Sequence, residues 1–243
     1  MRSRSLLRQA VSLSLSLGGA VLLSFLLGAA AFAQSKNLAP GFTTLPKNAK
    51  VVIMPTDIEL FLISGGGIPE PKADWTEAAN RHFKAALIEK KKALGATTVD
   101  ISDKDADEFE EINTLYAAVA RAINMHHFGP GIFNLPTKDG KLDWSMGDPV
   151  QRIKERTGAD YALFSWIRDS YASGERVVAM IVLAAFGIGV PGGMQVGYAS
   201  LVDLNTGRVL WFNRLVRGTG DLREPDKAKE TLDALLSGFP GSQ

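Results

Sequence analysis

The chain has 243 residues, with 27 basic and 26 acidic side chains, a formal net charge of +1, and no cysteine. A charge so near neutral provides no basic surface for nucleic acid or anionic lipid. The missing cysteine excludes disulfides, thiolate metal sites, a cysteine nucleophile and the lipid-bearing cysteine of a bacterial lipoprotein.

The first 33 residues have the layout of an export signal. Arg2, Arg4 and Arg8 precede an apolar stretch from Val11 to Phe32, and an A-x-A-type cleavage site ends at Ala33. We predict cleavage after Ala33 and a mature protein in the periplasm or cell envelope, with 24 basic and 26 acidic residues and a net charge of −2. A retained membrane anchor is the alternative, since 22 apolar-rich residues can span a bilayer.

The next segment, residues 34–49, is polar, contains two prolines and one glycine, and shows no sustained periodicity. We therefore predict a flexible N-terminal leader, followed by a single domain over residues 50–243. Val51–Met54 is a short, mostly β-branched run closed by Pro55, which is typical of a buried first strand. An acidic and apolar passage, Asp57–Leu62, and a glycine-rich loop follow it.

Two long helices are expected next. Asp74 is placed to cap the first helix, with Glu77 completing a capping box, and an apolar stripe continues to Leu94. A short strand, 97–101, then leads to a second amphipathic helix over residues 106–128.

The C-terminal half predicts one short helix over residues 148–157, a run of strands and a terminal helix. Asn205-Thr206-Gly207 should form a tight hairpin between the last two strands. The whole order predicts a single-domain α/β fold, with a mixed sheet of about six strands, helices packed on it and antiparallel C-terminal strands. The predicted strands are 161–171, 177–188, 195–204 and 209–216, and the terminal helix is 226–236.

Val177–Pro191 is unusual because it contains 15 residues without a charge or strongly polar group. Glycines and a proline interrupt it before it reaches the length of a membrane helix. Its continuous apolar character predicts a core strand buried on both faces. Two alternatives remain open: a surface for self-association or a partner, and a segment that inserts into a membrane.

Three short sequences carry a family resemblance: Val51–Pro55, Gly158–Leu163 and Val202–Trp211. They resemble envelope proteins related to the curli secretion channel and to the penicillin-binding-protein activator lipoproteins. The resemblance implies a non-catalytic α/β domain, periplasmic or associated with the outer membrane, that binds other envelope components. The chain departs from this family in lacking the lipid-bearing cysteine, so membrane association by a lipid anchor is not expected.

The sequence contains no pattern that clearly indicates a catalytic or metal site. His82, His126 and His127 are the only histidines, and adjacent helical residues such as the last two point about 100° apart, which disfavours a shared metal ion. Ser64–Gly67 matches no phosphate-binding pattern and is interpreted as a plain flexible loop. Asp57 and Glu59 share one side of an extended chain, where we expect them to keep an edge strand solvated. We predict no enzyme, no cofactor and no metal.

Five residues are candidates for partner binding, because tryptophan, tyrosine and arginine commonly anchor interfaces. Trp166, Arg168 and Tyr171 lie on the third predicted strand, and Trp211 and Arg214 lie on the last. We predict an exported binding or assembly protein that contacts an envelope protein or itself. The alternative is a periplasmic small-ligand-binding or transport accessory protein with its pocket near Gly65, and an uncharacterised hydrolase comes third.

Overall fold

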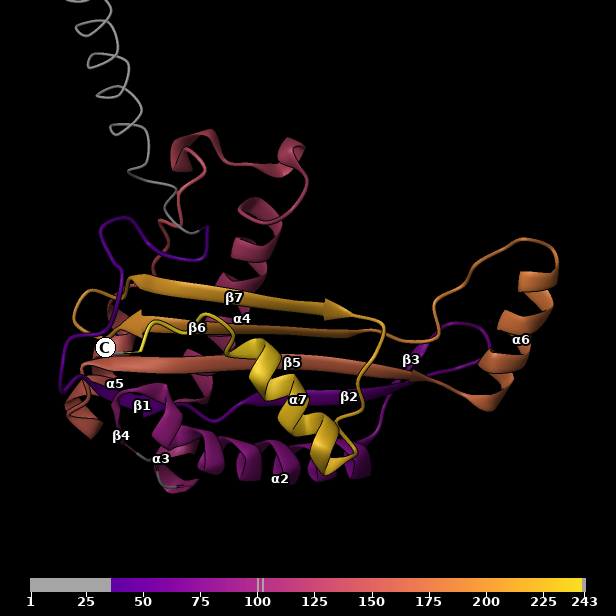
Figure 1. Ribbon diagram of the computed structural model, residues 1–243, viewed down its shortest axis with the longest axis horizontal. Coiled ribbons are helices and arrows are strands. Elements are labelled where there is room, and N and C mark those ends of the chain that lie inside the picture. The colour runs from indigo at the N-terminus through magenta and orange to yellow at the C-terminus, as the bar shows by residue number, and fades with distance from the viewer. Residues whose placement is uncertain (1–35, 100, 102, 242–243) are drawn as a thin grey trace, which may run out of the picture. The chain divides into compact units, whose positions relative to one another are not determined.

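The computed structural model describes residues 36–99, 101 and 103–241. The predicted export signal, residues 1–33, lies outside the described residues and stays a prediction. The described residues form a mixed α/β fold, as expected, and Figure 1 shows its sheet running across the molecule.

The sheet is organised around one long strand, β5. β1 and β2 both pair with β5 in parallel, one after the other along the same edge, while β6 pairs antiparallel along the opposite edge. β7 adds to β6 in antiparallel fashion, β3 adds to β2, and β4 adds to β1 in parallel. The strands are β1 (Lys50–Ile53), β2 (Asp57–Ile63), β3 (Pro69–Pro71), β4 (Thr97–Val99), β5 (Tyr161–Ala172), β6 (Gln195–Asp203) and β7 (Val209–Arg217).

Helices cover the sheet on both faces, because the central strands alternate side chains between two apolar clusters. Leu163 and Ile167 face a cluster that includes residues of α2 and α7, while Phe164 faces a cluster with residues of α4 and α5. In Figure 1, α7 crosses in front of the sheet. The helices are α2 (Ala73–Lys90), α3 (Asp103–Glu108), α4 (Glu110–His126), α5 (Gln151–Thr157), α6 (Gly174–Ala185) and α7 (Pro225–Leu235). Short 3-10 turns are η1 (Lys91–Leu94), η2 (Gly131–Phe133), η3 (Pro136–Lys138) and η4 (Asp148–Val150).

The two long helices form, with differences at their N-terminal ends. Lys72 rather than Asp74 is the N-cap of α2 and makes no side-chain capping bond, so the capping box is wrong. The second helix is interrupted at Phe109, where φ is −106°, and the ring of this residue is 2% exposed. The break separates the acidic α3 from the amphipathic α4.

Residues 36–49 pack onto the domain, although their polar composition predicted a flexible leader. Ala39 and Leu45 are buried in the α2/α7 cluster. The N–H of Ala39 donates to the carbonyl of Leu210 at 2.8 Å, and Leu38 bridges to Trp211 in antiparallel fashion. A few apolar side chains and backbone hydrogen bonds to β7 therefore order a segment that has no periodicity of its own.

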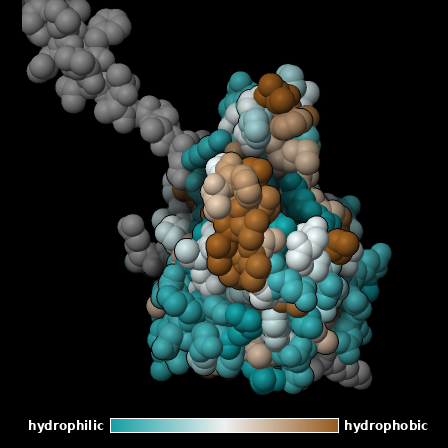
Figure 2. Space-filling model, turned by 90° about the vertical axis from the view of Figure 1, so that its right-hand side faces the viewer, coloured by the Kyte–Doolittle hydropathy of each residue, from teal (hydrophilic) through white to brown (hydrophobic). Residues whose placement is uncertain are grey.

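The predicted core strand 177–188 is wrong, because this segment forms α6. The Ser173 hydroxyl caps the helix by accepting from the N–H of Arg176 at 3.1 Å. β2, which forms from the passage Asp57–Leu62 that was left unassigned from sequence, pairs with β5 in parallel. No residue of α6 is buried, and Figure 2 shows it as an apolar patch on the surface. A continuous apolar run has no period that separates a strand from a helix.

The C-terminal hairpin is confirmed. β6 and β7 join through Asn205–Gly207, and Gly207 adopts a φ of +70°. A Cβ at this position would also lie 2.4 Å from the carbonyl oxygen of Gly147, so glycine is required for packing as well as for the turn.

Candidate binding face of the sheet

Two rows of side chains cross β2, β5, β6 and β7 on the sheet face that α4 partly covers. The register aligns Asp57, Trp166, Tyr198 and Arg214 as neighbours across the four strands. The next row, two residues further along each strand, is Glu59, Arg168, Val196 and Val216. Because side chains alternate along a strand, both rows project from the same face.

Four stacked rings form the floor of this face, which we call the aromatic ladder: Trp166, Tyr198, Phe212 and Phe128. Successive ring centroids lie 5.2, 5.7 and 5.4 Å apart, with interplanar angles of 11°, 29° and 25°. Offset stacking at such distances adds to the stability gained by burying the rings. The ladder joins β5, β6 and β7 to the end of α4.

Arg168 is held in a clamp of two carboxylates above the first ring of the ladder. Its guanidinium donates to Asp57 Oδ1 at 2.7 Å and to Asp57 Oδ2 at 3.1 Å, and its Nε lies 3.2 Å from Glu59 Oε2. The same guanidinium lies 4.5 Å from the centroid of Trp166. β2 lies between β3 and β5, so Asp57 and Glu59 do not solvate an edge strand as we expected. They do share one side of the strand, where they hold Arg168.

Arg121 and Arg214 flank the ladder at the surface. Arg121 lies 5.9 Å from the Trp166 centroid, and Arg214 lies 5.3 Å from the Phe128 centroid. Both side chains are exposed, and neither has a carboxylate partner in the part of the chain that the structure describes. Burial raises the pKa of Tyr198, while the nearby charges of Arg121 and Arg214 act in the opposite direction.

The face therefore presents charged groups around a shielded aromatic floor. Trp166 is 7% exposed and its indole N–H finds no acceptor among the described residues, whereas Val216 at the rim is 52% exposed. We call this surface the guanidinium face and define it by three arginines, two carboxylates and two apolar side chains: Arg121, Arg168, Arg214, Asp57, Glu59, Trp166 and Val216.

Only three of the five predicted partner-binding residues gather here: Trp166, Arg168 and Arg214. Trp211 is 1% exposed on the opposite side of the sheet, where its ring packs edge-on against Phe239 at 5.5 Å. This tryptophan is a core residue. Trp211 and Arg214 are three positions apart on β7, and because side chains alternate along a strand they lie on opposite faces of the sheet.

Tyr171 also lies on the opposite face, inside a structural cluster. Its hydroxyl donates to Asp169 at 2.6 Å and accepts from the N–H of Leu222 at 2.9 Å. Its ring packs edge-on against Trp75, and the guanidinium of Arg223 lies 3.9 Å from the ring centroid. Burial and the adjacent carboxylate of Asp169 raise the pKa of the phenol.

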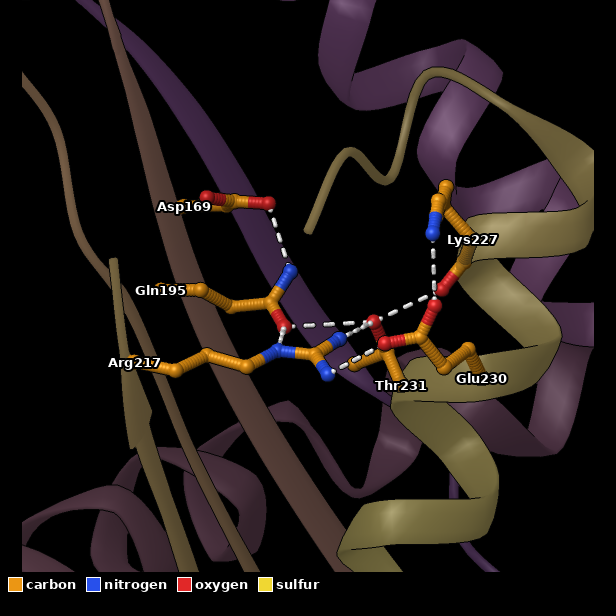
Figure 3. Close-up of polar contacts among 6 residues, drawn as sticks. All are labelled: Asp169, Gln195, Arg217, Lys227, Glu230 and Thr231. Carbon is orange, nitrogen blue, oxygen red and sulfur yellow. Dashed lines mark hydrogen bonds and ion pairs between the residues drawn. The ribbon is translucent and has the colours of Figure 1, made fainter. Parts of the chain in front are cut away.

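A buried polar network joins this cluster to α7, as Figure 3 shows. Gln195 donates to Asp169 at 2.7 Å and accepts from Arg217 Nε at 2.9 Å. Arg217 also donates to Thr231 at 2.7 Å and to Glu230 at 2.8 Å. Burial raises the pKa of Asp169, which is 2% exposed. Every member has a partner, so the network fixes α7 to the sheet.

Sequence reasoning missed this network. Its members are separated by up to 62 positions, and none forms a motif with its neighbours. One signal was present: polar residues lie within or at the ends of three strands, at positions 169, 195 and 217. Such interruptions become informative only once the register that pairs Asp169 with Gln195, and Gln195 with Arg217, is known.

His126 and His127 each contact a backbone carbonyl oxygen. His126 Nδ1 lies 2.7 Å from the carbonyl oxygen of Phe133, and His127 Nε2 lies 2.8 Å from that of Lys36. Burial lowers the pKa of His127. His82 lies on α2, and the described residues contain no group of three or more side chains suited to a metal ion.

The glycine loop joins β2 to β3 and contacts the start of α6. Its chain turns through a hydrogen bond from the N–H of Gly67 to the carbonyl of Ser64 at 2.9 Å. A Cβ on Gly65 would lie 3.3 Å from that of Glu175, so the loop packs against the helix base.

Among the described residues, no helix is both long enough and apolar enough to cross a bilayer.

Comparisons with known proteins give weak structural similarity. The sequence matches no family model, and no curated protein matches it. The chain is similar to a PelC dodecamer from Paraburkholderia phytofirmans at 13% identity and a TM-score of 0.40, over 85% of this chain and 95% of that one. It is also similar to lipoprotein GNA1162 from Neisseria meningitidis, at 14% identity and a TM-score of 0.32, over 78% and 94% of the two chains.

The C-terminal domain of LpoB from Escherichia coli is similar at 13% identity and a TM-score of 0.28, over 74% of this chain and 87% of that one. These matches agree with a weak resemblance to envelope proteins and identify no specific family. At such identities and scores, they carry no argument about function.

Proposed function

We propose that this chain is an exported, non-catalytic envelope protein that acts by binding another envelope protein through the guanidinium face. The observation that carries the proposal is the pair of exposed guanidiniums, Arg121 and Arg214, beside the aromatic ladder without a carboxylate partner in the described part of the chain. Arginine and large aromatic side chains supply much of the binding energy in protein interfaces.

The charges of this face specify the partner's chemistry. Arg168 is already paired with Asp57 and Glu59, so its charge is satisfied within the protein. Arg121 and Arg214 remain available to carboxylates, which guanidiniums bind in a planar, two-pronged geometry. We therefore expect an acidic protein surface with an apolar side chain that covers Val216. Protein–protein contacts of this kind fit an assembly role in the periplasm or at the outer membrane.

Charge-reversal variants test the proposal. Arg121→Glu combined with Arg214→Glu should leave the fold intact, since both side chains are exposed, and should abolish cross-linking to an envelope partner. Arg152→Glu is the matched control, because Arg152 is an exposed arginine on α5, away from the ladder. A partner retained by the double variant, or lost equally from the control, would overturn the proposal.

A small-ligand-binding function is the second candidate, and a cavity of about 450 Å³ favours it. The cavity is lined by residues 169–172, 191–195 and 218–220 together with Met180, rather than by Gly65 as we expected. Binding here would raise the melting temperature of a monomer when ligand is added. A monomeric protein with such a shift and without a cross-linked partner would favour this candidate.

A further inference from the structure

We propose that α6 is a lipid-contacting element that enters one leaflet of a bilayer. This inference does not depend on the guanidinium face, because it concerns a different surface. We call residues Gly174–Ile188 the α6 arm. In Figure 1 the arm extends beyond the end of the sheet, and in Figure 2 its apolar surface is surrounded by hydrophilic residues.

The arm exposes six large apolar side chains. Ile181 is 67% exposed, Val178 is 61% exposed and Phe186 is 78% exposed. Val177, Val182 and Ile188 are between 44% and 53% exposed. Clustered apolar side chains with this exposure are typical of a surface that contacts protein or membrane.

The chemistry of the patch fits hydrocarbon. From Val177 to Met194 the chain has no charged or hydrogen-bonding side chain, so the arm itself offers none of the side-chain hydrogen bonds of an ordinary protein interface. The helix satisfies its own backbone groups. Past its end, Gly187 donates to the carbonyl of Ala184 and Ile188 to that of Leu183. A segment whose backbone groups are paired can leave water without the large cost of unsatisfied N–H and C=O groups.

The length of α6 limits the depth of insertion. Twelve helical residues span about 18 Å, whereas the hydrocarbon core is about 30 Å thick. The arm can therefore contact one leaflet and cannot cross the bilayer. This geometry differs from the buried core strand predicted from sequence and matches the open alternative of membrane contact.

A second copy of the chain is a weaker occupant for the patch. A helix about 18 Å long and about 10 Å wide offers roughly 280 Å² on half of its surface. A stable interface usually buries about 800 Å² per partner. Pairing through the arm alone would fall well short of that area, whereas insertion into lipid needs no such minimum.

The base of the arm is tied to the end of β2, where the N–H of Ser173 donates to the carbonyl of Ile63 at 2.9 Å, and to the segment that returns to β6. Arg176 donates from Nη2 to the carbonyl oxygen of Pro191 at 3.3 Å. Gly193 packs so closely on β5 that a Cβ there would lie 2.0 Å from the carbonyl oxygen of Ser170. The polar residues Glu175 and Arg176 lie at the base of the arm. The apolar part of the arm extends away from the domain, and no residue of α6 is buried.

The missing cysteines allow a site-specific test. Ile181→Cys, labelled with the environment-sensitive fluorophore NBD, reports the polarity around the arm and not around the export signal. Ile132→Cys is the matched control, because Ile132 is 87% exposed in η2 on a different part of the domain. Both labelled proteins are mixed with neutral phosphatidylcholine vesicles, in low salt and in 1 M NaCl.

We expect a blue shift and a several-fold rise in NBD emission at position 181, similar in both salts, and no change at position 132. Nitroxide-labelled lipids should quench only the probe at position 181. Ile181→Asp with Phe186→Asp should remove vesicle contact by the arm while circular dichroism stays unchanged. No change at position 181, or equal changes at both positions, would overturn the proposal. A shift at position 181 that occurs without lipid and increases with protein concentration would assign the patch to self-association instead.

Discussion

Trp211→Ala and Arg214→Ala should separate the core from the binding face, although the two residues are only three positions apart on β7. The Trp211 ring is 1% exposed and packs against Phe239, so truncation leaves a large void among buried side chains. Substitutions of this kind cost about 3–5 kcal/mol. Against a total stability of about 5–15 kcal/mol, that is a large share.

Arg214→Ala should cost much less. Its side chain is exposed, and its described contacts are a hydrogen bond to Asn124 at 3.3 Å and a position over Phe128 at 5.3 Å. A surface cation–π contact is worth about 0.5–1 kcal/mol. Urea unfolding measures both values: the midpoint of Trp211→Ala should fall by about 1–5 M, given a cost of about 3–5 kcal/mol and slopes of about 1–3 kcal/mol/M. Equal losses in the two variants would refute the assignment of the residues to opposite faces.

Three further outcomes are expected. Burial raises the pKa of Asp169 in the folded protein, so protonation of this carboxyl stabilises the fold at pH values below the unfolded-state pKa of about 4. This stabilisation is lost as the pH rises through the folded-state pKa. The unfolding free energy of Asp169→Asn, measured against pH, should therefore not fall over this pH range. Gly193→Ala should destabilise by at least about 1–3 kcal/mol, because its Cβ would meet the Ser170 carbonyl at 2.0 Å, whereas Gly218→Ala, which enters open space, should show little change on thermal melting. Mass spectrometry of the protein from its native envelope should find Gln34 as the N-terminus, and a dominant full-length species would instead indicate a retained anchor.

The sequence predicted most of the elements whose patterns are local. The α4 stripe, the strand that begins at Tyr161 and the Gly207 hairpin each carry a periodicity or a turn residue that is sufficient to define them. The mixed α/β fold follows from the order of these elements.

The errors arose where local patterns are ambiguous or where distant contacts decide the structure. An uninterrupted apolar run such as 177–188 has no periodicity that separates a strand from a helix, and contacts elsewhere in the fold decide between them. Residues 36–49 are ordered by contacts with Leu210 and Trp211, more than 160 positions away, which composition cannot reveal.

The candidate site was predictable in part. The residue types pointed to Trp166, Arg168 and Arg214, and these three share the guanidinium face. The same criterion also selected Tyr171 and Trp211, because tryptophan and tyrosine serve cores as readily as interfaces. Alternation of side chains along β5 and β7 distinguishes the two groups. The carboxylates that hold Arg168 come from β2, whose pairing with β5 joins segments about 110 positions apart.

We propose that a partner in the envelope covers the guanidinium face. Site-specific photo-cross-linking in living cells tests it most directly, with the probe at Val216, which is 52% exposed at the rim. We predict one discrete cross-linked product that disappears in the Arg121→Glu, Arg214→Glu background and persists in Arg152→Glu. No product at Val216, or the same product from a probe at Ile132, would contradict the account.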